Sequence, residues 1–244
     1  MWEWLLSSID PGRAHLIDAA ISWHGRIMVL AWGVLVPCGI MAARFLKVVP
    51  WQDFPRELDN QLWWRLHLIG QCFAVLLSML GVYIVWEHGG DGGFHGVLGY
   101  AVTAIGLAQL FSGFLRGSKG GPTAPAKDGS IRGDHYDMTP RRLAFEVIHK
   151  TLGYGALALV AWALISGLWL ANAPRWMWIA IGGWWMVLLG LGVYWQSRGL
   201  AVDTYQAIWG SNPVHPGNRR KAQGWGMRRV KNDKTAEDGH VRGH

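Results

Sequence analysis

The sequence has few cysteines and little charge. Only Cys38 and Cys72 occur among its 244 residues, and both lie in apolar runs, where small buried residues are a better interpretation than a disulfide. There is no Cys-x-x-Cys-His motif, which argues against covalent attachment of a c-type haem, and the spacing of a zinc site is also missing. Charged residues make up only 16% of the chain, so an ordinary soluble domain is not expected.

Long apolar runs dominate instead, with 51% hydrophobic residues and 17 tryptophans. A helix needs about 20 apolar residues to cross a hydrocarbon core of about 30 Å. Five stretches reach this length, at residues 22–43, 64–86, 95–115, 146–170 and 176–196. The first follows a mixed segment without a basic leader or a cleavage site, so we expect a retained helix rather than a signal peptide. The sequence therefore predicts an all-α membrane protein with five transmembrane helices.

Basic residues are distributed unevenly between the connections. Arg13 and Arg175 are the only two expected on one side of the membrane, whereas 19 are expected on the other. Lysine and arginine gather on the cytoplasmic side of short loops. We therefore predict an N-terminus outside the cytoplasm, a cytoplasmic C-terminus and a place in the cell (inner) membrane. This topology accounts for the positive charge without a nucleic-acid partner.

Four of the five runs carry a histidine near their start: His24, His67, His95 and His149. Because successive helices cross in opposite directions, His24 and His95 share the outer depth, and His67 and His149 share the inner one. The alternative for each histidine alone is that it reaches the headgroups or a backbone carbonyl. Two imidazoles that face each other at one depth can hold a haem iron from both sides. Two pairs predict two haems.

Glycines near the histidines support this interpretation. Gly99 and Gly153 lie four residues after a histidine and Gly70 lies three after one, so a flat macrocycle could approach the backbone there. The alternative is close helix packing in lipid, which we prefer for Gly106 and Gly113. A weak repeat, HGRIMVLAWG and HGVLGYAVTAIG, suggests two helix pairs side by side. The fifth helix has no histidine and is expected to be peripheral.

These motifs resemble the cytochrome b561 and ferric reductase transmembrane family, especially members that accompany an extracellular DOMON domain. HGRIMVLAWGVLVPCGIMAARFLK is similar to the first core helix, and LHLIGQ, HGVLGY and IHKTLGYG match the other ligand helices. The resemblance covers about residues 22–170. It implies that the four histidines ligate two non-covalent b haems between which electrons cross the membrane, with no catalytic side chain. No DOMON domain precedes the first helix, so a separate outer redox partner is expected.

Two arginines have open interpretations. Arg142 lies seven residues before His149, on nearly the same helix face, where it could hold a haem propionate; the alternative is an ordinary arginine of a cytoplasmic loop. Arg26 either contacts an acidic group such as Glu87 or Asp91 or reaches the headgroups, and the second is slightly favoured. The family's ascorbate-contacting basic residues have no counterparts that can be assigned here, which leaves the donor open.

Two polar segments complete the chain. One loop contains three side chains of metal-binding type, Asp134, His135 and Asp137. A solvated loop is favoured over a metal site, because nothing fixes the ligand geometry. The basic tail, residues 197–244, is expected to lie on the anionic leaflet with Trp209 and Trp225 in the headgroups, or else to dock a partner.

The sequence thus divides into a short outer segment (1–21), a four-helix di-haem core (22–170), a fifth helix (171–196) and the tail. The expected function is transmembrane electron transfer, with membrane lipid and a separate redox protein, small reductant or quinol as partners. One alternative is a quinone-linked cytochrome b anchor for a separate dehydrogenase. A less favoured alternative is a haem carrier or structural subunit. Oligomeric state is left open.

Overall fold

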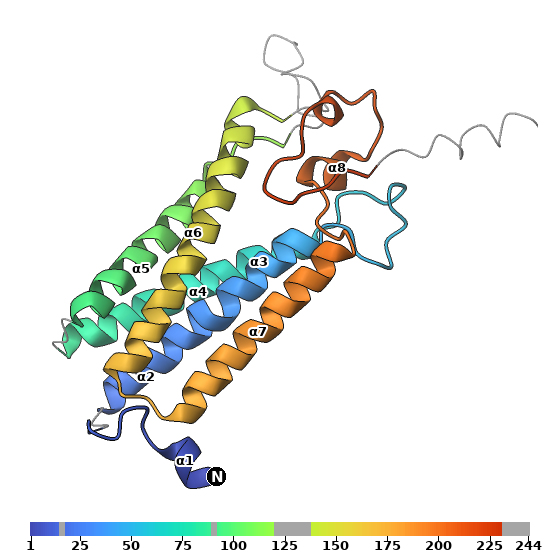
Figure 1. The fold of residues 1–244 in the computed structure, drawn as a ribbon. Coiled ribbons are helices and arrows are strands. Elements are labelled where there is room, and N and C mark those ends of the chain that lie inside the picture. Colours follow the sequence, from blue (N-terminus) through green and yellow to red (C-terminus); the bar gives the residue numbers. More distant parts are fainter. Residues whose placement is uncertain (15–17, 89–91, 120–137, 231–244) are drawn as a thin grey trace, which may run out of the picture.

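The computed structural model describes residues 1–14, 18–88, 92–119 and 138–230 and is all-α in that part of the chain (Figure 1). The predicted loop with Asp134, His135 and Asp137 lies outside the described residues. Five helices are long and apolar enough to cross a membrane, which confirms the predicted number. The first spans Ala19–Phe45, and the other four are α4 (Leu62–Glu87), α5 (Gly93–Phe114), α6 (Pro140–Leu170) and α7 (Arg175–Ser197).

The first span is continuous but changes its helical form near its middle. It begins as α2 (Ala19–Met28), loosens into the π-helical η1 (Val29–Leu35) and continues as α3 (Val36–Phe45). Pro37 follows the π-helical turn and has no N–H to give to a carbonyl of the preceding turn. The carbonyl of Gly33 instead accepts a hydrogen bond from Trp184 Nε1 of α7 at 2.9 Å. A π-helical turn inside a span often marks a functional site.

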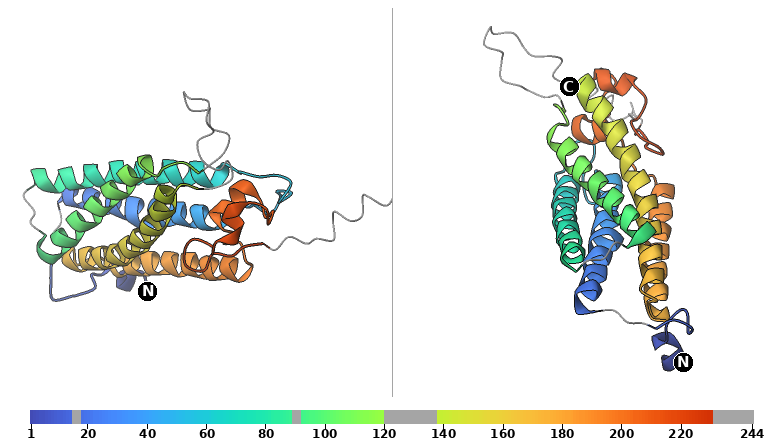
Figure 2. Two further views of the ribbon diagram at one scale, coloured as in Figure 1. Left: turned by 90° about the horizontal axis from the view of Figure 1, so that it is seen from above. Right: turned by 90° about the vertical axis from the view of Figure 1, so that its left-hand side faces the viewer.

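The helices form two antiparallel pairs. The first span packs along α4, and α5 packs along α6, as the repeat in the sequence suggested (Figure 2). Between the pairs lies a buried apolar cluster to which all four spans contribute: Ala31, Trp32, Val36, Ala74, Val102, Val160 and Leu164. Burial of these side chains against one another in place of lipid joins the pairs into one bundle.

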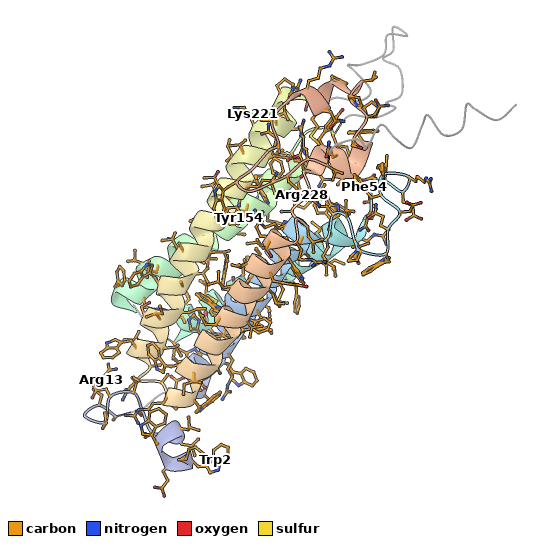
Figure 3. The ribbon with its side chains drawn as sticks, turned by 45° about the vertical axis from the view of Figure 1, so that its right-hand side comes forward. Trp2, Arg13, Phe54, Tyr154, Lys221 and Arg228 are labelled. Atoms are coloured by element: carbon orange, nitrogen blue, oxygen red, sulfur yellow. The ribbon has the colours of Figure 1, made fainter. Side chains whose placement is uncertain are left out.

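The two ends of the bundle carry different short elements (Figure 3). Trp2 and Arg13 lie at one end, called here the His24 end, and Lys221 and Arg228 lie at the other, the His67 end. At the His24 end, α1 (Trp2–Leu6) leads into a segment that Asn172 holds through its side chain. Asn172 Oδ1 accepts from Asp10 N at 3.0 Å, and its Nδ2 donates to the carbonyls of Asp10 and Arg13 at 3.0 and 2.7 Å.

At the His67 end, residues 200–230 fold into a C-terminal cap, which contains α8 (Thr204–Trp209) and η2 (Pro216–Arg219). The cap is tied to the bundle by hydrogen bonds from Arg44, Lys150 and Gln196 to the carbonyls of Trp225, Gln223 and Gly226, at 3.0, 2.8 and 2.8 Å. Within the cap, buried Asp203 pairs with Arg229 at 3.1 Å.

The cap differs from the tail expected to rest on lipid. Trp209 is half-buried, and its Nε1 donates to the carbonyl of Lys119 at 3.1 Å, so it packs inside the protein rather than standing free in the headgroups. Trp225 does remain 84% exposed. The tail is also tied to the bundle by hydrogen bonds from residues far away in the sequence, such as Arg44 and Lys150, which no local pattern indicates.

Burial at the cap shifts the pKa of two groups. Lys47 lies just after the first span, is 3% exposed and donates to the carbonyl of Val202 at 3.2 Å. Burial, and then the nearby Lys150, lowers the pKa of Lys47 to about 7. Burial also raises the pKa of Asp203, although a backbone hydrogen bond from Gln223 and the charge of Arg229 oppose that rise.

Candidate functional site

The four predicted histidines meet in two pairs. His24 of α2 and His95 of α5 have ring centroids 6.2 Å apart, with the ring planes at 88°. His67 of α4 and His149 of α6 have ring centroids 6.1 Å apart, with the ring planes at 76°. These are the two pairs that depth alone predicted. Their role as haem ligands stays a prediction.

The separation of the rings matches a metal ion held between them. A histidine nitrogen binds a metal ion at about 2.0–2.1 Å. Two such bonds to one metal ion, plus about 1 Å from each nitrogen to its own ring centre, would place the ring centres about 6 Å apart. The observed 6.2 and 6.1 Å agree with this estimate at both pairs. Edge-to-face rings in direct contact have centres in the same range, about 4.5–7 Å apart, so the spacing permits a shared metal ion and does not by itself require one.

In the first helix pair, each histidine is held by a carbonyl of the neighbouring helix. His24 Nδ1 lies 2.9 Å from the carbonyl oxygen of Gly81, and His67 Nδ1 lies 3.0 Å from that of Gly39. A carbonyl can only accept, so each Nδ1 carries the proton and donates it. Each Nε2 is then left with its lone pair, which is the form of histidine that binds a metal.

In the second helix pair, serine hydroxyls take part. His95 Nδ1 lies 3.1 Å from the carbonyl oxygen of Ala163 and 3.2 Å from the hydroxyl of Ser166. His149 Nδ1 lies 3.4 Å from the hydroxyl of Ser112. All four rings are therefore oriented by a partner on an adjacent helix. These partners, which hold the ring and its tautomer, were not identified from the sequence.

A large cavity surrounds the His24 and His95 pair. Its volume is about 900 Å³, within the range of about 300–1,000 Å³ typical of cofactor sites. Its walls come from both helix pairs and also from α7, through Trp176, Met177, Ala180 and Ile181. The fifth helix was expected to be peripheral, yet it closes one side of this cavity. Absence of a histidine did not make it irrelevant to the site, because a cofactor also needs apolar walls.

Glycines leave room beside the histidines. A Cβ on Gly99 would meet no protein atom within 4 Å, and Gly99 lines the large cavity, as expected for a residue that admits a flat ligand. The sequence reading missed Gly167, where a Cβ would stand 2.8 Å from His95 Cε1. Gly167 therefore lets the His95 ring lie against α6. Gly153 lies near a different group, since a Cβ there would meet Gln109 Nε2 at 3.4 Å.

Arg142 lies at the His67 end but has a protein partner. Its Nε is 3.2 Å from Glu146 Oε1, and Lys150 Nζ is 2.9 Å from the other oxygen of the same carboxylate. Arg142 and Glu146 are both buried. This ion cluster was not predicted from the sequence. The spacing of Glu146, one helical turn after Arg142, could have indicated it. The cluster holds positive charge near the His149 ring, and contact of Arg142 with a propionate stays a prediction.

Arg26 lies beside an aromatic ring. Its guanidinium carbon is 5.1 Å from the ring centre of Trp23, three residues earlier on the same helix. Trp23 is exposed, so this contact lies at the protein surface, as expected for an arginine that reaches the headgroups. Asp91, one of its two suggested acidic partners, lies outside the described residues.

Comparison with known proteins finds relatives of modest identity. A cytochrome b561, DM13 and DOMON domain-containing protein of Arabidopsis thaliana is 29% identical over 148 residues, which are 59% of this chain and 14% of that protein. A cytochrome b561 and DOMON domain-containing protein of the same plant is 25% identical over 160 residues, 64% of this chain and 33% of that protein. Ferric-chelate reductase 1 of Bos taurus is 24% identical over 149 residues, 59% of this chain and 22% of that protein.

The chain spans no more than a third of the length of these three relatives. No family model matches the chain, and no solved structure does. The aligned share nevertheless corresponds in size to the four-helix core that contains the histidine pairs. The chain is therefore similar to cytochrome b561 and ferric-chelate reductase proteins over about 60% of its length, which is consistent with a b561 family core.

Proposed function

We propose that this multi-pass membrane protein carries electrons across the bilayer through two non-covalent b haems, each held by one histidine pair. The observation that carries the proposal is the set of four rings, 6.2 and 6.1 Å apart in two pairs, each with its Nδ1 turned to a neighbouring helix. The names of the relatives support transmembrane electron transfer in general. The number of haems and the cell membrane as location belong to the proposal.

A haem held by two histidines would be suited to electron transfer. His24 with His95, and His67 with His149, would hold the groups, and each haem would supply an iron that gains and loses one electron. The protein orients the imidazoles through the Gly81, Gly39, Ala163 and Ser112 acceptors and surrounds the centre at the His24 end with apolar walls. A buried apolar cluster fills the core between the two helix pairs.

The positive charges near His149 would stabilise the reduced form of a bound cofactor or pair with its carboxylate groups. Arg142 and Lys150 share the single carboxylate of Glu146, so this cluster has one more positive than negative group. We propose that the surplus pairs with a haem propionate, as the position of Arg142 in the sequence suggested. The redox partners are proposed to be separate molecules, a protein or a small reductant or quinol.

Vesicles test the function directly. We would reconstitute the haem-loaded protein into lipid vesicles that hold ferricyanide and add ascorbate, a quinol or a soluble reduced cytochrome outside in turn. At least one donor is expected to reduce the trapped oxidant, and the effective donor identifies the partner class. Oxidant loss no faster than in protein-free vesicles, with all three donors and with two haems bound, would contradict the proposal.

Gly167→Ala is expected to damage the haem at the His24 end. The new methyl group would meet the His95 ring at 2.8 Å, so the ring must move away from its ligand position. Alanine favours a helix over glycine by about 0.8–1.0 kcal/mol, so helix propensity cannot cause the loss. We expect the haem-to-protein ratio to fall from two towards one. Gly155→Ala on the same helix meets no atom within 4 Å and should keep both haems.

The orientation of the chain is a separate expectation. The expected distribution of basic residues, two on one side of the membrane and 19 on the other, predicts a cytoplasmic C-terminus. After His244, a fused reporter enzyme that works only in the cytoplasm should therefore be active, and one that works only outside should be inactive. A reporter fused before Met1 should be active only outside. The reverse result would exchange the surfaces assigned to the two haems and would leave the pairing of the histidines unchanged.

A further inference from the structure

Trp32 lies midway between the two histidine pairs. It follows His24 by eight residues and precedes Gly39, whose carbonyl accepts from His67, by seven. At 1.5 Å per residue these separations are about 12 Å and about 10 Å along the helix axis. Trp32 belongs to the π-helical turn η1, the irregular part of the first span.

The indole of Trp32 lies in the buried cluster to which all four core helices contribute. It is 5% exposed and belongs to the same buried cluster as Ala74 of α4, Val102 of α5 and Val160 of α6. A Cβ on Gly106 of α5 would stand 2.8 Å from Trp32 Cη2. Gly106 therefore makes room for this ring, which agrees with the close helix packing preferred for it from the sequence. The indole is therefore part of the core that the four helices share.

The ring of Trp32 brings a polar atom into the core. Trp32 Nε1 is buried, and within the described residues it has no hydrogen-bond partner. The same holds for the hydroxyls of Ser78, four residues after Ala74, and of Thr103, which directly follows Val102. An unpaired buried N–H is costly, and phenylalanine would fill a core without that cost. What the indole offers beyond phenylalanine is a wider aromatic surface.

We propose that Trp32 is the bridging residue through which electrons pass between the two haem sites, an inference that rests on the proposed function. One electron leaves one iron and arrives at the other, so the first is oxidised and the second reduced. No bond forms or breaks, and the indole keeps its own electrons. Electronic coupling falls off less steeply through packed atoms, and aromatic atoms above all, than through a gap, so the ring sets the rate of exchange.

The test compares three substitutions with a matched control in the full-length, haem-loaded protein. Trp32→Leu and Trp32→Met remove the aromatic ring, and Trp32→Phe keeps one. The control is Trp185→Leu, because Trp185 of α7 packs against the same cluster and also has a buried, unpartnered indole nitrogen, but lies outside the four core helices. After a light flash that injects one electron from a photoreductant, the exchange between the haems is followed by absorbance.

We expect Trp32→Leu and Trp32→Met to slow the exchange by on the order of tenfold, with two haems bound and both midpoint potentials within error of wild type. Trp32→Phe should recover most of the rate, and Trp185→Leu should match wild type. If Trp32→Leu loses a haem, Trp32→Met, whose unbranched and flexible side chain adapts to an irregular space, decides the outcome.

Three results would overturn the inference. These are a wild-type rate in a two-haem variant without the ring, an equal slowing by Trp185→Leu, and a slowing explained by shifted potentials. The first would leave the proposed function intact. A wild-type protein with fewer than two haems would remove the proposed function itself, and that failure is visible before any variant is made.

Discussion

His24→Ala and His95→Ala are each expected to abolish the same haem, and the double change should do little more damage than either single one. The two ring centres lie 6.2 Å apart and are proposed to hold one iron together, so loss of either ring would remove the shared site. His67→Ala and His149→Ala should converge in the same way on the other haem. Redox titrations of the purified variants, read by absorbance, distinguish the two haems.

The loss of haem should be non-additive for two substitutions within one histidine pair and nearly additive for substitutions in different pairs. Four independent haem sites would instead give additive losses throughout. His88→Ala is the matched control, because His88 is an exposed histidine whose Nδ1 bonds to Ile84 of its own helix. It should keep both haems. The pairing would be wrong if His24→Ala and His67→Ala removed the same component of the titration.

Any of these four substitutions should also stop electron flow across vesicles. With one haem absent, an electron must cross most of a hydrocarbon core about 30 Å thick without a stop, which direct transfer does not do at a useful rate. The surviving haem should still be reduced by a donor added on its own side. The measurement is the reduction of trapped ferricyanide, with His88→Ala vesicles at equal protein loading as the reference.

If electron flow persisted at the reference rate with either histidine pair broken, electrons would not cross the bundle in two steps through both haems. Flow that survives loss of one pair and fails with the other would point to a single functional haem. Either outcome is distinguishable from misfolding, because the surviving haem reports a folded bundle in the same sample.

The spans and histidine pairs could be predicted because length and depth determine them. An apolar run of about 20 residues has few choices but to cross the bilayer, and a histidine near its start must lie near one surface. Depth left only one partner for His24 and one for His67. The π-helical turn at Val29–Leu35 was not predicted, since the same residues also fit an ordinary helix.

The groups that hold the histidines were harder to find. Gly39 and Gly81 act through their carbonyls, and every residue has a carbonyl, so their sequence identity carries no signal. Ser112 and Ser166 did carry a signal in the sequence, because a polar side chain within a membrane span needs a hydrogen-bond partner. Gly167 is revealed only by the approach of the His95 ring from another helix.

Long-range contacts explain the remaining differences. The fifth helix was placed at the periphery because it lacks histidine, yet Trp176 and Ala180 line the cavity from a helix that follows the core in the chain. The cap depends on ties between distant residues, such as Arg44 with Trp225 and Lys150 with Gln223. No local pattern in a basic, glycine-containing tail predicts such partners.

The most direct measurement of the central claim is the haem-to-protein ratio of the purified wild-type chain. Acidified acetone should extract all of the haem, because no covalent attachment is expected, and the extract should contain two b haems for each polypeptide. A ratio near one, or colour that stays with the denatured chain, would contradict an account in which each of two histidine pairs holds its own haem.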